Sequence, residues 1–135
     1  VNRGWGGGGL GDGLARLEFT GRTPLEMHSV GLKKDGFEIR FTKPVAAGSG
    51  ATATAYRLEQ YGYRYWKTYG SPRIDVEPVE VRDVTWSADR RSVRLTTSPM
   101  RAGKVCKLSL VDVRADDGDV LLHADAFYTM NALPD

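Results

Sequence analysis

The side chains best suited to bind a ligand lie in the stretch YGYRYWKTY, residues 61–69. Five of the chain's thirteen aromatic residues fall within these nine positions. Tyr and Trp rings combine an apolar face with a polar tip, so they can stack on a sugar ring or anchor a partner domain. The stretch therefore predicts a ligand-binding or partner-binding surface made of Tyr61, Tyr63, Arg64, Tyr65, Trp66, Lys67 and Tyr69.

Catalytic chemistry has less support. Nucleophilic catalysis needs a nucleophile, a base and an orienting group in register. The chain has two histidines, His28 and His123, and one cysteine, Cys106. Cys106 alternates with Leu108 and Leu110, which predicts a small buried side chain rather than a reactive thiolate. We expect no enzyme, and a small hydrolase that uses one of the histidines is the further alternative.

An acidic run near the C-terminus raises the question of calcium, which prefers six to eight oxygen ligands. Its carboxylates belong to Asp112, Asp116, Asp117 and Asp119. Their spacing does not fit the D-x-D-x-D-G loop, and Asp117 with Gly118 is explained as the turn of a hairpin. These residues are candidate ligands only, and we expect neither a metal nor a cofactor.

Glycines at positions 4, 6 and 9 satisfy the spacing G-x-G-x-x-G. A nucleotide-binding loop needs a strand before this motif and a helix after it, and neither pattern is present. Residues 1–13 contain seven glycines and are predicted to be a flexible linker.

Composition narrows the possible partners. A chain of 135 residues is expected to form one domain. Its 19 basic and 17 acidic residues are interspersed and give a net charge of +2, so nucleic acid is not an expected partner. No apolar run approaches the roughly 20 residues that span a bilayer, so no membrane insertion is expected. The basic pair at residues 90–91 is expected to lie in a solvated turn.

The apolar pattern predicts an all-β fold. Leu17 and Phe19 alternate with charged residues, which is typical of a half-buried strand. Asp35 and Gly36 separate two apolar runs and predict a hairpin with a type I′ turn. About seven strands separated by turn residues indicate an immunoglobulin-like β-sandwich with Greek-key connections. Residues 69–78 are expected to form a loop fixed by the prolines at positions 72 and 78. The predicted core comprises Leu17, Phe19, Phe37, Ile39, Phe41, Leu58, Val81, Val84, Val93, Leu95, Leu108, Leu110, Val111 and Phe127.

Within this fold, the aromatic stretch is too rich in rings for one strand to bury, because alternate side chains leave the core face. Tyr56 and Leu58 are expected to face the core and Tyr61 the opposite side. Gly62 is expected to mark a bulge, beyond which the strand continues to Trp66. At least two of the five rings should therefore reach solvent.

The chain resembles bacterial immunoglobulin-like modules of the S-layer type over residues 30–130. The features that carry the resemblance are a strand ending in Phe-x-x-Pro-Val, a "dg-x-x-V-x-L" strand, a "G-x-x-Y-x-L" strand, an Asp-x-x-Gly hairpin and a final Phe-x-Thr strand. They fall at 41–45, 89–95, 103–108, 112–118 and 127–129. Cys106 stands where these modules usually have Tyr. The resemblance implies the sandwich fold, and such modules have many roles.

A second resemblance concerns residues 13–72, which are similar to a segment of large exported bacterial proteins. There an immunoglobulin-like module adjoins a glucose/sorbosone dehydrogenase-type propeller and a cytochrome c-type domain. The resemblance implies an extracytoplasmic, non-catalytic accessory module, with residues 1–24 as a linker or the closing strand of a preceding domain and residues 25–135 as the module. No C-x-x-C-H motif for haem attachment occurs. The expected partners are neighbouring domains or, as the alternative, an oligosaccharide or polysaccharide on the aromatic stretch.

Overall fold

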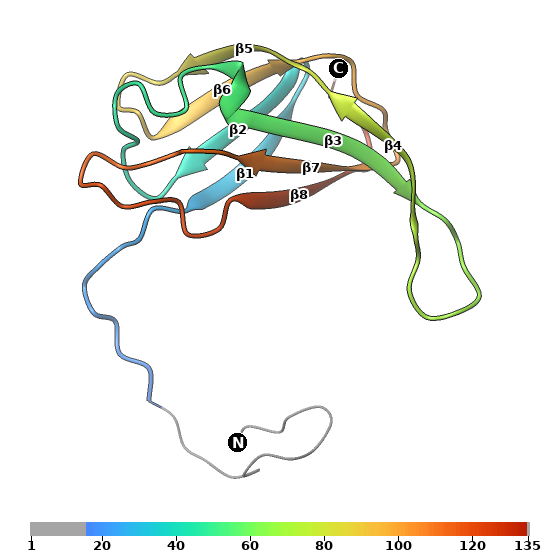
Figure 1. The fold of residues 1–135 in the computed structure, drawn as a ribbon, viewed down its shortest axis with the longest axis horizontal. Helices are drawn as coiled ribbons and strands as arrows, with labels where there is room; N and C mark the ends of the chain where they lie inside the picture. Colours follow the sequence, from blue (N-terminus) through green and yellow to red (C-terminus); the bar gives the residue numbers. More distant parts are fainter. Residues whose placement is uncertain (1–15, 135) are drawn as a thin grey trace.

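The computed structural model describes residues 16–134 of the chain, which form a sandwich of two antiparallel sheets (Figure 1). This part of the chain contains eight strands and one short 3-10 helix. Their bounds are β1 Met27–Lys33, β2 Gly36–Phe41, η1 Ala53–Ala55, β3 Tyr56–Tyr63, β4 Arg73–Val79, β5 Val81–Trp86, β6 Ser92–Thr97, β7 Lys104–Leu110 and β8 Asp125–Met130.

The strand order is that of an immunoglobulin-like Greek key. One sheet has the order β1-β2-β6-β5 and the other β4-β3-β7-β8. In immunoglobulin constant domains, strands A, B, E and D form one sheet and strands C, F and G the other. The present fold has the same arrangement with β4 added beside β3. The predicted all-β sandwich is therefore confirmed, with eight strands in the described residues instead of about seven.

The added strand corrects one prediction. Residues 69–78 were expected to form a loop held by two prolines, but Arg73–Val79 is strand β4. Pro78 lies within it, opposite Glu59 of β3. Proline has no N–H to donate, and it is tolerated because β4 is an edge strand with a neighbour on one side only.

Most of the predicted core is buried between the sheets. Eight predicted members are confirmed, namely Phe37, Ile39, Phe41, Leu58, Val93, Leu95, Leu108 and Leu110. Val81 and Val84 are half-buried against the core, and Val111 is half-buried while Val113 is buried in the core instead. Cys106 is fully buried, as predicted. The core also contains Leu25, Val45, Tyr56, Val79 and Met130.

Three predicted core residues are wrong. Leu17 is 97% exposed and Phe19 is 81% exposed, and residues 16–20 form no strand. A strand needs a neighbouring strand to pair with, and these residues make no strand pairing with the rest of the described chain. Phe127 is 58% exposed, because in β8 the residues that face the core are Tyr128, Met130 and Ala126. Tyr128 packs edge-on against Phe37 at 5.6 Å between ring centroids.

The β1–β2 hairpin is confirmed, but its turn differs from the prediction. Lys33 pairs with Gly36, so Lys34 and Asp35 are the two turn residues, and neither has a positive φ. A type I′ turn is therefore absent. Gly36 is needed for a different reason: a Cβ atom there would lie 1.9 Å from the carbonyl oxygen of Leu95 on β6. The glycine thus permits the close approach of β2 and β6.

The two ends of the sandwich carry different segments (Figure 1). The segment that precedes β1, residues 16–26, lies at one end together with the β2–β3 loop and the β7–β8 loop; we call this segment the incoming chain. The β3–β4 hairpin and the end of β8 lie at the other, and the hairpin loop extends away from the sheets. The candidate site residues are divided between these two ends. The predictions for glycines 4, 6 and 9 fall outside the described residues.

Candidate functional site

The predicted aromatic surface lies on the projecting β3–β4 hairpin, and we call residues 61–74 the aromatic hairpin. The register of β3 against β4 shifts between Gln60 and Gly62, so the predicted bulge is confirmed. Strand β3 ends at Tyr63 instead of continuing to Trp66. Beyond the strand, the Arg64 N–H donates to the carbonyl of Pro72 at 3.1 Å, which closes the base of the loop.

Tyr61 is the one aromatic side chain of the hairpin that is fully buried. It lies opposite Val105, on the side of the sheet facing away from the core, as its position in β3 predicts. The ring of Tyr63 covers it edge-on at 5.4 Å, and the Arg73 guanidinium lies 4.4 Å from its centroid. The hydroxyl contact with Tyr63 and burial raise the pKa of Tyr61. Tyr61 therefore serves as a fixed base for the hairpin rather than a free binding ring.

The other four rings are open to solvent. Tyr65 and Tyr69 are fully exposed, and Tyr63 and Trp66 are about half exposed. The Arg64 guanidinium lies 4.9 Å from the centre of the Trp66 ring, a cation–π distance. The prediction that at least two rings reach solvent is confirmed. That these rings bind a ligand or a partner stays a prediction.

The charge of the aromatic hairpin has one sign. Arg64, Lys67 and Arg73 are its charged residues, and no Asp or Glu occurs between positions 61 and 74. The nearest carboxylates belong to the strands below it. Glu59 pairs with Arg73 at 3.2 Å, and Asp75 pairs with Lys104 at 3.0 Å. The loop beyond Tyr63 thus presents rings together with the positive charge of Arg64 and Lys67.

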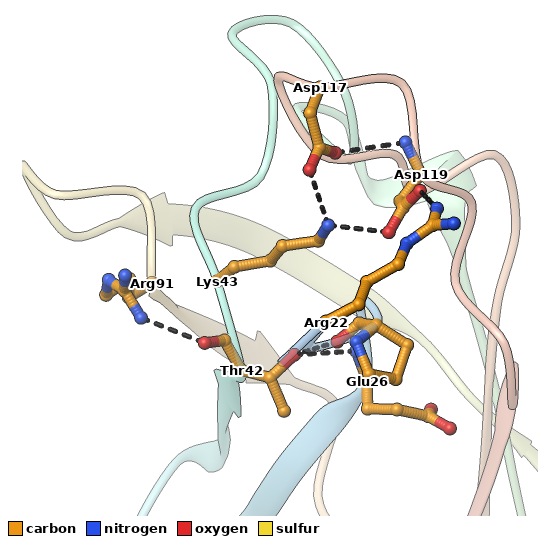
Figure 2. Close-up of polar contacts among 8 residues, drawn as sticks. Arg22, Glu26, Thr42, Lys43, Arg91, Asp117 and Asp119 are labelled. Carbon is orange, nitrogen blue, oxygen red and sulfur yellow. Dashed lines mark hydrogen bonds and ion pairs between the residues drawn. The ribbon is translucent and has the colours of Figure 1, made fainter. Parts of the chain in front are cut away.

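A second cluster of polar contacts lies at the opposite end of the sandwich, where the chain enters it; we call it the junction (Figure 2). Thr42, just after β2, is its centre. Its hydroxyl donates to the carbonyl of Pro24 at 2.6 Å and accepts the N–H of Glu26 at 2.9 Å. The Arg91 guanidinium donates to the carbonyl of Thr42 at 2.9 Å. The two bonds of the hydroxyl hold the incoming chain on both sides of Leu25, whose side chain is fully buried in the core.

Charged side chains extend the junction to the β7–β8 loop. The Lys43 ammonium lies 2.6 Å from a carboxylate oxygen of both Asp117 and Asp119, and Arg22 reaches Asp119 at 2.5 Å (Figure 2). Hydrogen bonds to Lys43 lower the pKa of both aspartates, and those same bonds raise the pKa of Lys43. The backbone N–H of Asp119 also donates to the Asp117 carboxylate.

The junction changes how the acidic run is interpreted. Two of the four candidate calcium ligands, Asp117 and Asp119, already surround an ammonium group. Asp112 adopts a φ of 55°, and its carbonyl accepts a hydrogen bond from the Ser49 hydroxyl. Asp116 is exposed. Within residues 16–134, no group of three or more His, Cys, Asp or Glu side chains is arranged to hold a metal ion.

The candidate catalytic residues are separated. Cys106 is fully buried in the core, and burial raises the pKa of its thiol to about 12, so it carries no thiolate near neutral pH. His28 is exposed on β1. His123 is 77% exposed, and its ring contacts the Glu26 carboxylate. This last pair links the β7–β8 loop to the incoming chain and thus adds to the junction.

One half-buried polar cluster was not predicted. Arg90 was expected to be solvated, but its guanidinium donates to the carbonyls of Val45, Ala46 and Ser49. It also lies 4.0 Å from the Trp86 ring centre. Both the indole N–H of Trp86 and the hydroxyl of Tyr56 donate to the carbonyl of Gly50.

This cluster fixes the β2–β3 loop. Gly50 has a φ of 59°, and a Cβ atom there would lie 2.9 Å from the Tyr56 hydroxyl. The sequence SADRR, residues 87–91, indicates a turn, but it does not indicate that Arg90 bonds carbonyl groups more than 40 positions away.

The fold is shared with domains of a bacterial cell-surface protein. No protein-family model matches the chain, and no curated protein sequence matches it. Among solved structures, the S-layer protein SbsC is similar with a TM-score of 0.59 and 16% identity, over 81% of this chain and 14% of that one. A structure of SbsC domains 1–6 gives a TM-score of 0.57 and 15% identity, over 79% of this chain and 14% of that one.

The N-terminal part of the bacterial S-layer protein SbsC is similar with a TM-score of 0.59 and 16% identity, over 81% of this chain and 24% of that one. The present chain thus spans less than a quarter of the length of each of these structures. The match shows the fold: an all-β module like those of an S-layer protein.

None of the helices in the described chain is both long enough and apolar enough to cross a membrane.

Proposed function

We propose that the chain is a non-catalytic structural module of a larger exported protein, and that it holds a neighbouring domain in a fixed position. The observation that carries this proposal is the junction. Hydrogen bonds with Thr42 and the ion pair between Arg22 and Asp119 tie the incoming chain to the β2–β3 and β7–β8 loops. The ion pairs of Lys43 tie those two loops to each other. A linker that only spaces two domains would not need such contacts.

Exposed apolar side chains next to the junction support contact with a neighbouring domain. Leu17 and Phe19 lie five and three residues before Arg22, and both are largely exposed. Val120 and Leu122 of the β7–β8 loop are also more than half exposed. The Leu122 N–H donates to the carbonyl of Leu25, so this loop lies beside the incoming chain. These four side chains are the proposed surface for the neighbouring domain, with residues 1–24 as the linker or closing strand.

The cellular context of the proposal rests on resemblance. The S-layer neighbours are multidomain proteins in which a similar fold occupies part of the chain, which supports an extracytoplasmic location. The second sequence resemblance extends this to a sugar-oxidising parent with a dehydrogenase-type propeller. In such a parent, the redox chemistry would belong to other domains, since Cys106 is buried in the core of this module and the His123 ring is paired with Glu26.

The proposal is tested on the parent protein by small-angle X-ray scattering and by hydrogen exchange. We expect Arg22→Met to leave the sandwich folded but to increase the maximum dimension of the parent, because the incoming chain loses its ion pair with Asp119 of the β7–β8 loop. Phe19→Asp should expose the surface of the neighbouring domain to exchange. A parent whose scattering and exchange are unchanged by both variants would contradict the proposal.

A second candidate function is carbohydrate binding by the aromatic hairpin. The observation that favours it is the full exposure of Tyr65 and Tyr69 on a loop that projects from the sandwich. Exposed ring faces can meet the C–H groups of a sugar while Arg64 and Lys67 donate to its oxygens. A titration of the 135-residue chain with oligosaccharides, followed by intrinsic tryptophan fluorescence and repeated with Trp66→Ala, tests this function.

A further inference from the structure

We infer that the aromatic hairpin binds an anionic polysaccharide, one whose sugar rings carry carboxylate groups. This inference rests on the second candidate function and names its ligand class. Three properties of the hairpin carry the inference: the sign of its charge, the exposure of its rings and the rigidity of its base.

The charge of the hairpin distinguishes an anionic ligand from a neutral one. Residues 61–74 contain three cationic side chains and no carboxylate, whereas the whole chain has 19 basic and 17 acidic residues. Elsewhere cations are commonly paired, as Lys43 is with Asp117 and Asp119. On the loop beyond Tyr63, Arg64 and Lys67 have no neighbouring acidic residue in the sequence. A carboxylated polymer would supply the missing negative charge, and Arg binds carboxylates through paired N–H groups.

The exposed rings distinguish a sugar polymer from a simple anion. A phosphate or sulfate ion would need N–H donors but no aromatic surface. Tyr65 and Tyr69 stand fully in solvent, and Trp66 is 44% exposed beside the Arg64 guanidinium. A guanidinium beside an indole presents a donor and an apolar face to one sugar unit. Rings on both limbs of the loop can contact successive units of a chain.

The base of the hairpin is held in place before any ligand arrives. Tyr61 is buried between Tyr63 and Arg73, and the loop is closed by the Arg64 to Pro72 hydrogen bond. Burial of Tyr61 therefore fixes the direction in which the loop leaves the sheet. A fixed base lowers the ordering cost of binding, because fewer side chains and backbone angles must be immobilised.

The test is a titration of the complete 135-residue chain with polygalacturonate, alginate and hyaluronate, with dextran as the neutral control. We expect saturable binding to at least one carboxylated polymer, at least about tenfold weaker binding to dextran, and affinity that falls with added salt. Trp66→Ala, measured by calorimetry because it removes the one tryptophan of the hairpin, should weaken binding about tenfold or more. The double variant Arg64→Gln with Lys67→Gln should remove the salt dependence.

Matched control variants test whether a loss of polysaccharide binding is specific to the hairpin. Phe127→Ala removes an exposed aromatic ring from β8, and Arg57→Gln with Arg82→Gln removes two exposed cations from other strands. These variants should bind as the unmodified chain does. If they weaken binding as much as the hairpin variants do, the polymer is held by overall charge and the inference fails.

The remaining outcomes separate the possible ligands. Equal affinity for dextran and the anionic polymers would overturn the anionic ligand but keep the carbohydrate function. Tighter binding to single-stranded DNA or to phosphatidylglycerol vesicles than to any polysaccharide would overturn both. No binding to any of these probes would also overturn both. None of these results bears on the proposed structural role, which depends on the scattering of the parent protein.

Discussion

The junction and the aromatic hairpin lie at opposite ends of one sandwich, and they treat charge in opposite ways. At the junction, each of Lys43, Asp117 and Asp119 has a partner of opposite sign within 2.6 Å. On the hairpin loop, Arg64 has an aromatic ring beside it, and no acidic residue lies nearby in the sequence. Paired charges stabilise a local structure, whereas cations without acidic neighbours and exposed rings favour contact with another molecule. The comparison therefore supports the proposals of a structural role for one end and a binding role for the other.

The largest expected effect on stability is at Leu25, where the junction meets the core. Its side chain is fully buried, so Leu25→Ala leaves a cavity. We expect the free energy of unfolding to fall by about 2–5 kcal/mol. Urea denaturation of the 135-residue chain measures this loss. A loss under roughly 0.5 kcal/mol, the usual size for a surface substitution, would show that the incoming chain is not part of the folded unit.

A smaller effect is expected at the centre of the junction. Thr42→Val keeps the shape of the side chain but removes the hydroxyl that bonds Pro24 and Glu26. The expected loss is about 1 kcal/mol, the usual contribution of such hydrogen bonds. Hydrogen exchange should locate the change, with faster exchange at the Glu26 amide and no change on the hairpin. The Thr52→Val variant, at an exposed threonine, is the control.

The ion pairs of the junction predict a dependence on pH. The pKa values of Asp117 and Asp119 lie below the ordinary 3.8, so their stabilising contribution is present above that value and is lost as pH falls through the lower folded-state pKa. Lys43 has a pKa raised above 10.5, so its contribution is present below 10.5 and is lost as pH rises through the higher folded-state value. NMR titration of the aspartate carboxyls and the Lys43 ammonium checks both directions. The Lys43→Met variant should return the pKa of Asp117 toward 3.8.

The smallest effect on stability is expected at the hairpin rings. Tyr65→Ala and Tyr69→Ala remove fully exposed side chains, so the free energy of unfolding should change by less than about 0.5 kcal/mol. Tyr61→Ala is the matched contrast, because the same substitution there removes a buried ring with two neighbours. A loss at Tyr65 equal to that at Tyr61 would mean that the loop is packed against the module in solution.

Local sequence patterns predicted the positions of the strands better than they predicted which side chains of a strand face the core. Alternation identified β8, but it placed Phe127 in the core where Tyr128 and Met130 lie. Period-two patterns cannot decide the direction when both faces of a strand carry large side chains. Strand β4 was missed because Pro78 indicates a loop, and only its edge position makes that proline acceptable.

The two candidate sites differ in how far the sequence revealed them. The aromatic hairpin is contiguous in sequence, so its composition was enough to single it out. The junction joins residues 97 positions apart, such as Arg22 and Asp119, and 74 positions apart, such as Lys43 and Asp117. No local pattern indicates such pairings. The acidic run therefore raised the question of calcium, whereas in the structure Lys43 and Arg22 supply the positive charge beside Asp117 and Asp119.

The most direct test of the division between the two ends is a ¹⁵N NMR titration of the complete chain with polygalacturonate. We expect chemical-shift changes at the amides of residues 63–71 and at the indole N–H of Trp66. Amides of residues 22–26 and 117–119 should stay unchanged. Shifts centred on the junction, or shifts spread evenly over both ends, would contradict the assignment of structure to one end and binding to the other.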